Sequence, residues 1–577
     1  MIRIRRIVDD ILPRDAKALN SAITLLNERF PEAPVGEFAK LGSTLRDPLA
    51  SGLRTLMYVA EDSRGGLRGC AVVQHDPSVD SILLDWLASS VGETGGVGAA
   101  LWTRVYDDAV RLRAVGVFLE CLPDEPDSAG RIPEHLADNK RRLAFYERLG
   151  ARPIVGTAYE RPVKPGDRDL PYLVVAPCQA APLSAKVVRG VVRSILEKKY
   201  RDYCPPEYVE IVVDSYRDPI QLRPSRYGPP PLPKAPTLAE EDRIALVVHG
   251  RHAAHHIRER GYVESPARVD RILTVLEASG RFTKVEPKKY PRTAITAVHD
   301  PAYVSWLDKV AGTLEAGQMV YPYVFPVRNA ARMPDDLAIR AGYWCIDTFT
   351  PLHRDVATIA RGAAETALTA ADALLEGRRL AYALVRPPGH HAERALYGGF
   401  CYFNNAAVAA QHLRRKGAER VAMVDVDYHH GNGQQDIFYT RSDVLTVSLH
   451  GHPRFAYPYF SGFPDEKGEG EGKGFNLNVA LPEVLDGEAY GAALDSALKR
   501  VRDFDPTVLV VCLGLDTAKN DPTGTWSLRE SDFRENGRRI ARLRRPTLLV
   551  QEGGYGLRVL GRHALAFLTG LHEETLA

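Results

Sequence analysis

Four short apolar runs in the second half of the chain are each followed directly by polar or charged residues. They cover residues 380–385, 421–424, 506–513 and 546–551. Runs of this length that are apolar throughout are typical of strands buried on both faces of a parallel sheet. Open α/β sheets carry their chemistry at the carboxyl ends of such strands, so we expect the residues after these runs to meet at one edge.

These strand ends carry the side chains of a metal site with acid and base groups. Asp427 and His429 are two positions apart and project to the same side if the chain stays extended. Oxygen and nitrogen ligands together suit zinc, and a catalytic zinc keeps three protein ligands and one open position. The remaining candidates are Asp516 as third ligand, the paired His390 and His391, and the phenol of Tyr555. One acid after a strand is often only a helix cap, but four such strand ends together indicate an active site.

These residues lie in motifs that resemble those of the histone deacetylase and acetylpolyamine amidohydrolase superfamily of zinc-dependent deacetylases. The resemblance runs from about Ile244 to near the C-terminus. Its segments are 386–391, 399–405, 425–433, 448–450, 513–516 and 552–555. It implies an arginase/deacetylase-type α/β domain with a central, mostly parallel sheet.

The resemblance also implies a role for each motif residue. Zinc would be held by Asp427, His429 and Asp516, and a structural monovalent cation, usually potassium, by Asp425, Ser448 and Leu449. The catalytic residues would be the acid and base pair His390 and His391, their partners Asp425 and Asn432, and Tyr555, which polarises the scissile carbonyl.

The two histidines should differ in pKa because their expected partners differ in charge. An anionic partner raises the pKa of a histidine, and a neutral partner raises it less. Asp425 stands behind His390, whereas Asn432 stands behind His391 where some relatives have Asp. We therefore predict that His391 is the principal base, and that Tyr555 donates to the oxyanion.

Aromatic residues around the site indicate the substrate class. In the resembled enzymes, the positions of Phe400 and Tyr457 face each other across a narrow tunnel, and Gly399 precedes the first of them. The aromatic segment 455–460 and the segment 318–336, a candidate entrance loop, look closer to the acetylpolyamine branch than to enzymes that act on histones. In that branch an inserted loop narrows the entrance and helps form a dimer. We expect a small acetylated amine as substrate and a homodimer.

Three alternatives stay open at this point. One is a deacetylase of acetyllysine in proteins. Another is a manganese-dependent enzyme resembling ureohydrolases, although a binuclear site needs more carboxylates than these motifs show. The third is a non-enzymatic sensor of an acyl ligand.

The N-terminal part carries a second pattern. A strand predicted over 81–91 is followed by a glycine-rich turn and an amphipathic helix, a combination that can cradle phosphates. This turn and the segment 139–151 resemble the acyl-coenzyme A loop and a late helix of GCN5-related N-acetyltransferases. The resemblance implies that acetyl-CoA is bound at Gly96, Gly98 and Ala99 and that Tyr146 is a general acid. Glu93 departs from the usual Arg or Gln and would disfavour a pyrophosphate.

Composition fits a cytoplasmic protein of more than one domain. The chain has 577 residues, 45% of them hydrophobic, and a formal net charge of +2, so nucleic acid and membrane are not expected partners. Its seven cysteines form no CxxC pair and suggest a reducing compartment. We predict an acetyltransferase-like α/β domain over 1–180, a helix and proline-rich linker over 181–242, and the deacetylase domain over 243–577. The nine prolines of residues 205–236 predict an extended, semi-rigid connector within this linker. The sequence leaves open whether the basic helix near 185–200 packs on the first domain.

Overall fold

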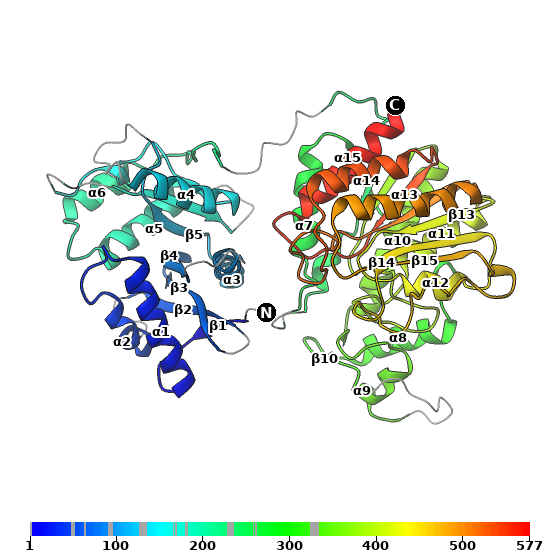
Figure 1. Ribbon diagram of the computed structural model, residues 1–577, viewed down its shortest axis with the longest axis horizontal. Coiled ribbons are helices and arrows are strands. Elements are labelled where there is room, and N and C mark those ends of the chain that lie inside the picture. The colour runs from blue at the N-terminus through cyan, green and yellow to red at the C-terminus, as the bar shows by residue number, and fades with distance from the viewer. Residues whose placement is uncertain are drawn as a thin grey trace. The chain divides into compact units, whose positions relative to one another are not determined.

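A computed structural model of the protein divides into two compact units, Met1–Pro231 and Leu232–Ala577 (Figure 1). It describes residues 3–47, 52–62, 65–90, 96–125, 135–164, 167, 170–178, 183–227, 236–257, 259, 262–323 and 334–577. Among these residues, no helix has the length and apolar character that a membrane span requires.

The second unit is built on an eight-stranded sheet in which every neighbouring pair is parallel. Its strand order is β15-β14-β13-β16-β17-β12-β8-β9. The strands are β8 (Ile244–Val248), β9 (Phe282–Val285), β12 (Leu380–Leu384), β13 (Val421–Asp425), β14 (Val444–Gly451), β15 (Asn476–Leu481), β16 (Val508–Leu513) and β17 (Thr547–Gln551). A small antiparallel pair is formed by β10 (Met319–Val320) and β11 (Leu352–His353). The prediction of a mostly parallel sheet for this part of the chain is confirmed.

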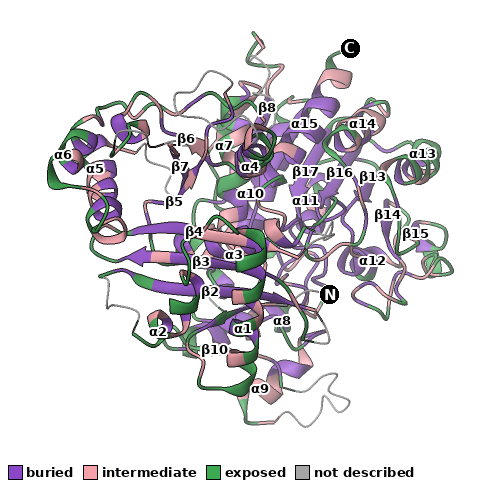
Figure 2. Ribbon diagram, turned by 60° about the vertical axis from the view of Figure 1, so that its left-hand side comes forward, coloured by how far each residue is buried: buried purple, intermediate pink, exposed green. Residues whose placement is uncertain are grey.

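Helices cover both faces of this sheet, which explains why its central strands are mostly apolar on both faces. One face packs against α8 (Pro301–Thr313), α10 (Val356–Leu375), α11 (Asn405–Arg415) and α12 (Asn432–Phe438). The other packs against α7 (Ala267–Ala278), α13 (Gly487–Phe504), α14 (Glu530–Ala541) and α15 (Leu560–Leu576). The central strands β13, β16 and β17 are accordingly buried along their length (Figure 2), and the short α9 (Leu337–Arg340) stands apart from these layers.

The first unit has a seven-stranded mixed sheet in the order β1-β2-β3-β4-β5-β7-β6. The strands are β1 (Arg3–Ile7), β2 (Arg54–Glu61), β3 (Leu67–Asp76), β4 (Ser81–Ser89), β5 (Gly116–Cys121), β6 (Arg152–Pro153) and β7 (Tyr172–Pro177). Among its described strand pairs only β4 and β5 are parallel. Their pairing ends at Leu84 and Leu119, although both strands continue beyond these residues.

Helices also cover both faces of the sheet in the first unit. The helices α3 (Val97–Arg111) and α4 (Leu136–Arg148) pack on one face. The other face is covered by α1 (Pro13–Arg29) and α2 (Leu41–Arg46) together with α5 (Ala185–Ser194) and α6 (Pro206–Asp214).

Part of the predicted linker, residues 181–242, belongs to the first unit and is helical. The basic helix belongs to the first unit, because Val188, Val191 and Val192 of α5 pack against Leu83 and Phe118 of the sheet. Residues 206–214 are helical and not extended. A helix tolerates proline in its first turn, where the missing N–H has no partner within the helix, and Pro206 takes that place in α6. The proline cluster at 229–231 lies outside the described residues.

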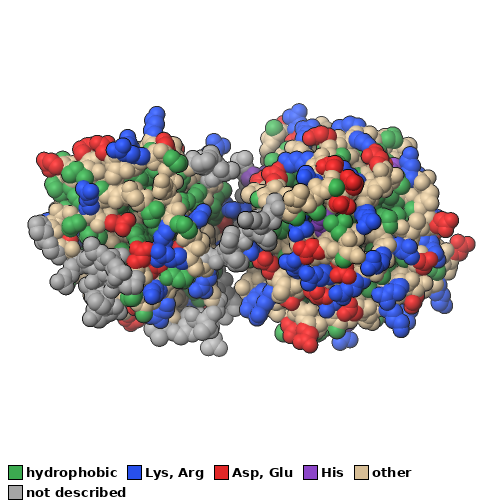
Figure 3. All heavy atoms as spheres, turned by 90° about the horizontal axis from the view of Figure 1, so that it is seen from above, with side chains coloured by type: hydrophobic (Ala, Val, Ile, Leu, Met, Phe, Trp, Pro, Cys, Tyr) green, Lys and Arg blue, Asp and Glu red, His purple; other side chains and the backbone are tan. Residues whose placement is uncertain are grey.

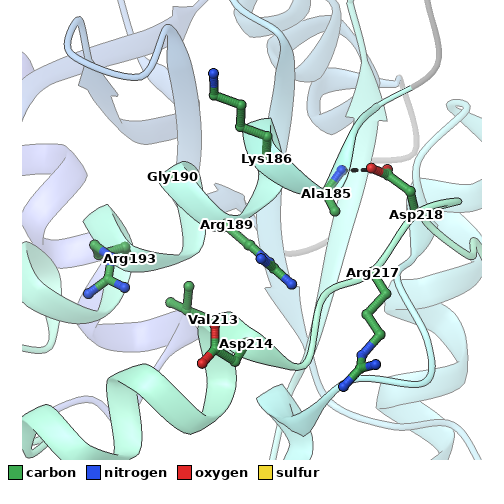
Figure 4. A pocket seen from close by; sticks show the side chains of 9 residues that line it. All are labelled: Ala185, Lys186, Arg189, Gly190, Arg193, Val213, Asp214, Arg217 and Asp218. Atoms are coloured by element: carbon green, nitrogen blue, oxygen red, sulfur yellow. Dashed lines mark hydrogen bonds between the residues drawn. The ribbon is translucent and has the colours of Figure 1, made fainter.

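A surface cavity of about 540 Å³ lies between α5 and the end of α6 (Figure 4). Its lining includes Arg189, Arg193 and Arg217 as well as two carboxylates. The charge of Arg193 is matched by Glu197 and Glu210, and Arg189 donates to the carbonyl of Tyr216. Basic and acidic side chains are likewise mixed over the face shown in Figure 3. None of the predicted site residues lines this cavity.

Candidate metal centre and catalytic residues

The four strands whose ends carry the motif residues are direct neighbours in the sheet, in the order β13-β16-β17-β12. Because all four run parallel, their carboxyl ends lie at one edge. The chain therefore brings together residues that are up to 165 positions apart in the sequence, from His390 to Tyr555.

Asp427, His429 and Asp516 direct one ligand atom each towards a common point. Nδ1 of His429 lies 3.1 Å from Oδ1 of Asp427 and 3.0 Å from Oδ2 of Asp516, and the three ligand atoms lie within 4.8 Å of one another. The backbone N–H of Gly553 donates to Asp427 at 2.8 Å, and that of Tyr428 donates to Asp516 at 2.9 Å. One imidazole nitrogen and two carboxylate oxygens, held in place by backbone donors, fit a zinc ion.

Burial and mutual repulsion affect the two carboxylates differently. Both Asp427 and Asp516 are fully buried. Burial and the neighbouring charge of Asp427 raise the pKa of Asp516 to about 7. Burial also raises the pKa of Asp427, but His390 and His429 outweigh it and hold this pKa below its usual range. A cation at the common point would compensate both carboxylates.

Glycine allows the backbone to approach these ligands closely. A Cβ atom on Gly514 would lie 2.2 Å from Oδ2 of Asp427, and one on Gly553 would lie 2.5 Å from Oδ2 of Asp516. No side chain fits at such distances. The glycines of the segments 513–516 and 552–555 are therefore required for the ligands to occupy these positions.

The paired histidines have the unlike partners that the resemblance implied. Nδ1 of His390 lies 3.0 Å from Oδ2 of Asp425, whereas Nδ1 of His391 lies 2.7 Å from Oδ1 of Asn432. Burial lowers the pKa of His390, but Asp427 and Asp425 outweigh it and raise this pKa to about 10. Burial and the positive charge of His390 lower the pKa of His391 well below its usual range. The pair thus contains one charged and one neutral imidazole near pH 7.

The orientation of Asn432 also fixes the tautomer of His391. Its amide nitrogen donates to the carbonyl of His391 at 3.2 Å and to Glu393 at 2.8 Å, so its oxygen faces the imidazole. An oxygen acceptor requires the proton on Nδ1 of His391. The Nε2 atom of His391 therefore keeps a free lone pair.

Tyr555 is held by contacts that the sequence did not indicate. The guanidinium of Arg268 lies 4.7 Å from the centre of the Tyr555 ring, and its Nε donates to the carbonyl of Gly554 at 2.6 Å. Glu264, four residues before Arg268, pairs with it at 3.0 Å. Asp521 accepts the N–H of Tyr555 at 2.7 Å. Burial raises the pKa of the phenol well above its usual value, so Tyr555 is a hydrogen-bond donor near neutrality.

Asp521 is therefore occupied with the backbone and does not extend the metal site. It also accepts N–H groups of Gly556 at 2.9 Å and Thr523 at 3.0 Å. Among the described residues, the group that includes Asp427 contains only three metal-ligand side chains. This arrangement disfavours the binuclear alternative, which requires further bridging carboxylates.

The residues of the predicted monovalent cation site lie on adjacent strands. Asp425 and Ser448 are opposite each other in the register of β13 and β14, and Leu449 follows. The hydroxyl of Ser448 is within 2.9 Å of Nδ1 of His450 and accepts the N–H of Gly431 at 3.3 Å. Potassium binding here stays a prediction.

Aromatic rings flank the histidines and the phenol. The ring of Phe349 lies between those of Phe400 and Tyr457, with centroid distances of 5.6 and 5.7 Å. Tyr457 is 4.7 Å from His391. Gly399 has a φ of +56°, and a Cβ there would lie 2.2 Å from Cδ2 of His391. Phe349 was not predicted, because nothing near it in the sequence distinguishes it from a core aromatic.

The predicted entrance loop, 318–336, lies partly outside the described residues. Its first part includes β10. At its other end, Asp336 caps α9 by accepting the N–H of Ile339 at 3.0 Å. Its role at an entrance and in a homodimer stays a prediction.

The predicted coenzyme residues of the first unit lie around the start of α3. Gly96 precedes this helix with a φ of +78°, a conformation that favours glycine, and Gly98 and Ala99 are in its first turn. The ring of Phe145 would lie 3.5 Å from a Cβ on Gly98, so α4 packs against this turn. Tyr146 is buried against Trp102, with a centroid distance of 5.2 Å. Glu93 lies outside the described residues.

One edge of the second unit thus combines a place for a divalent metal with side chains that transfer protons, which is the arrangement of a metal-dependent hydrolase. Residues 262–571 match the histone deacetylase domain. Acetylpolyamine amidohydrolase 1 of Pseudomonas aeruginosa is 42% identical over 314 residues, which are 53% of this chain and 90% of that protein. The acetylpolyamine amidohydrolase of Mycoplana ramosa is 38% identical over 313 residues, which are 53% and 92% of the two chains.

A solved structure agrees with these matches. The acetylpolyamine aminohydrolase from Burkholderia pseudomallei superposes with a TM-score of 0.54 at 38% identity and covers 57% of this chain and 99% of its own. The chain belongs to the histone deacetylase family, whose members are zinc-dependent deacetylases.

Replacement of a metal ligand provides the first test. We expect about one zinc per chain in the native protein, and loss of both zinc and turnover in Asp427→Ala and in Asp516→Ala, because three ligands are the minimum for a catalytic site. Elemental analysis of the purified variants measures this. The exposed acid Asp335, changed to Ala, is the matched control and should keep its zinc. Two metal equivalents that disappear together in the ligand variants would contradict a single-zinc site.

Proposed function

We propose that the second unit hydrolyses a small acetylated amine, with an acetylpolyamine as the preferred substrate, and releases acetate. The observation that carries this proposal is the pair of histidines with one anionic and one neutral partner beside the metal-ligand group. The relatives named as acetylpolyamine amidohydrolases, at 38–42% identity, support the substrate class. The aromatic rings around His391 supply apolar walls for an alkyl chain.

Zinc would be held by Asp427, His429 and Asp516, where it would act as a Lewis acid on the amide oxygen and make a water more acidic. His391 is neutral, with the free lone pair on Nε2, so it is suited to accept a proton from the attacking water. His390 carries the proton that Asp425 and Asp427 stabilise, and it is suited to protonate the departing amine.

Tyr555 would donate a hydrogen bond to the oxygen that becomes negative during attack. Arg268 keeps this phenol in place through its ring face and the carbonyl of Gly554. A donor that is fixed before the reaction stabilises developing charge without reorganisation. The buried surroundings strengthen this interaction further.

Tyr555→Phe separates binding from chemistry. We expect kcat to fall about 100-fold or more while zinc content and KM stay near those of the native protein, because only the donor to the oxyanion is lost. Steady-state kinetics with an acetylated diamine measures this change. Tyr203→Phe, at an exposed tyrosine of the first unit, is the control. An unchanged kcat in Tyr555→Phe would leave the phenol as a structural residue only.

Substrate size provides a separate test. If the aromatic walls grip a slender chain, acetylputrescine and acetylspermidine should have a higher kcat/KM than acetyllysine in a folded protein. Tyr457→Ala should reduce this preference about 5- to 100-fold, the range for loss of one aromatic contact. Equal or faster turnover of intact acetylated proteins would favour the alternative, a protein deacetylase, and would leave the hydrolytic mechanism standing.

For the first unit we propose binding of an acyl-coenzyme A at the start of α3. A left-handed glycine directly before a helix supports this proposal, since backbone N–H groups at a helix N-terminus receive phosphates well. The parallel strands β4 and β5 of the same unit stop pairing with each other after Leu84 and Leu119. Transfer of an acetyl group to an acceptor would follow only if an acceptor also binds.

A charge placed in the first turn of α3 tests this second proposal. Gly98→Asp should be compatible with the helix, because an acid in the first turn is favourable, but it should weaken binding of acetyl-CoA about 10-fold or more by repulsion of the phosphates. Gly98→Ala should bind normally, since its Cβ would meet neighbours only at 3.5 Å. Calorimetric titration of the full chain measures both. No binding to the native protein, or equal binding in all three, would contradict the proposal.

A further inference from the structure

The carboxylate of Asp347 is hydrogen-bonded, directly or through Thr350, to all three residues that form the aromatic walls, Phe349, Phe400 and Tyr457. Asp347 lies five residues before β11 and is followed by two exposed residues, but its own side chain is buried. It accepts the N–H groups of Phe349 at 3.0 Å and of Thr350 at 2.9 Å on Oδ1. Its Oδ2 accepts the N–H of Gly399 at 2.6 Å and the phenol hydroxyl of Tyr457 at 3.0 Å. One buried side chain therefore joins three separate segments of the chain.

Phe400, the third aromatic wall, is linked to the carboxylate of Asp347 through the hydroxyl of Thr350. The Oγ1 atom of Thr350 donates to Oδ2 of Asp347 at 3.0 Å and accepts the N–H of Phe400 at 3.1 Å. Phe400 has a φ of +69°, a region that bulky residues rarely adopt. Such a conformation persists only where its surroundings hold it, and the hydroxyl of Thr350 and the neighbouring Gly399 N–H are both fixed by Asp347.

The contacts are also those that only a carboxylate satisfies. Among the described residues, five donor groups face its two oxygens and no acceptor is hydrogen-bonded to them. An asparagine would turn an NH2 group towards at least two of these donors, and all three N–H groups belong to the backbone and cannot turn away. Such charge-assisted hydrogen bonds are stronger than neutral ones. Their loss should therefore shift the segments that they hold, which carry Phe349, Gly399 and Tyr457.

We propose that Asp347 is the positioning residue that sets the distance between the aromatic walls, and thereby the width of substrate that reaches His391. This inference rests on the proposed hydrolysis of a slender acetylated amine. Asp347 touches neither the histidine pair nor the metal-ligand group. It acts through the hydroxyl of Tyr457, whose ring lies 4.7 Å from His391, and through Phe349, which lies between the other two rings.

Kinetics of Asp347→Asn, Tyr457→Phe and the double variant test the proposal. In Asp347→Asn we expect KM for acetylputrescine to rise about 10-fold, as for loss of a charge-assisted hydrogen bond, while kcat changes less and zinc content stays the same. The preference for acetylputrescine over an acetyllysine peptide should fall by a similar factor. Tyr457→Phe keeps the ring and loses only the hydroxyl, so it should change selectivity in the same direction but less.

The double variant distinguishes a linked effect from two separate ones. If Asp347 acts partly through the Tyr457 hydroxyl, the double variant should resemble Asp347→Asn alone and not show the product of the two changes. Asp443→Asn is the matched control, because Asp443 pairs with Arg414 and Arg441 on the surface and has no contact with the aromatic walls. Multiplicative effects in the double variant, or a substrate preference unchanged in Asp347→Asn, would overturn the proposal.

Hydrogen exchange gives a readout that does not depend on activity. The amides of Phe349, Thr350 and Gly399 should exchange about 10-fold faster or more in Asp347→Asn, because each loses a buried acceptor. Thr350→Val, which removes only the bridging hydroxyl, should speed exchange at Phe400 and provides a second variant if Asp347→Asn does not fold. Native protein that hydrolyses no acetylated amine would defeat the proposed function. Unchanged exchange at these amides would defeat the positioning role separately.

Discussion

Two buried carboxylates, Asp427 and Asp516, lie against one imidazole, and the need to compensate their charge constrains the rest of the second unit. One oxygen of each carboxylate lies next to Nδ1 of His429, and the other accepts a hydrogen bond from a backbone N–H. Such an arrangement requires loops that approach within a few ångströms, which the glycines at 514 and 553 permit. The parallel order of β13, β16 and β17 brings these loops together at one edge.

The same charge distribution shifts the pKa values of the two paired histidines in opposite directions. His390 is close to two carboxylates and is held in its charged form, whereas His391 faces a neutral amide and the positive charge of its neighbour. Two adjacent residues of one type are thereby suited to act as an acid and as a base. The difference arises from Asp425 and Asn432, which lie seven positions apart on the same strand end and the helix that follows it.

The sequence was most informative where chemistry follows directly after a buried strand. The carboxyl ends of parallel strands must share an edge, so the positions of Asp427, Asp516 and Tyr555 near one another followed from the apolar runs alone. Arg268 and Asp347 could not be found in this way. Arg268 holds the carbonyl of Gly554, 286 residues further along the chain, and such long-range contacts leave no local pattern.

Helix formation near the proline-rich segment shows the opposite limitation. Prolines at 205 and 206 suggested an extended connector, but the same residues are well placed at a helix start. Local composition did not show that valines on α5 and α6 would pack against the sheet of the first unit. Packing against a distant surface decided between the two conformations.

Zinc-edge X-ray absorption on the purified full-length protein tests the central claim most directly. The account predicts one zinc per chain with one imidazole nitrogen and carboxylate oxygens at about 2.0–2.2 Å. A second metal at about 3.5–4 Å would indicate a binuclear centre. Sulfur ligation at about 2.3 Å would place zinc on cysteines and away from Asp427, His429 and Asp516. Either of these two results would contradict the account.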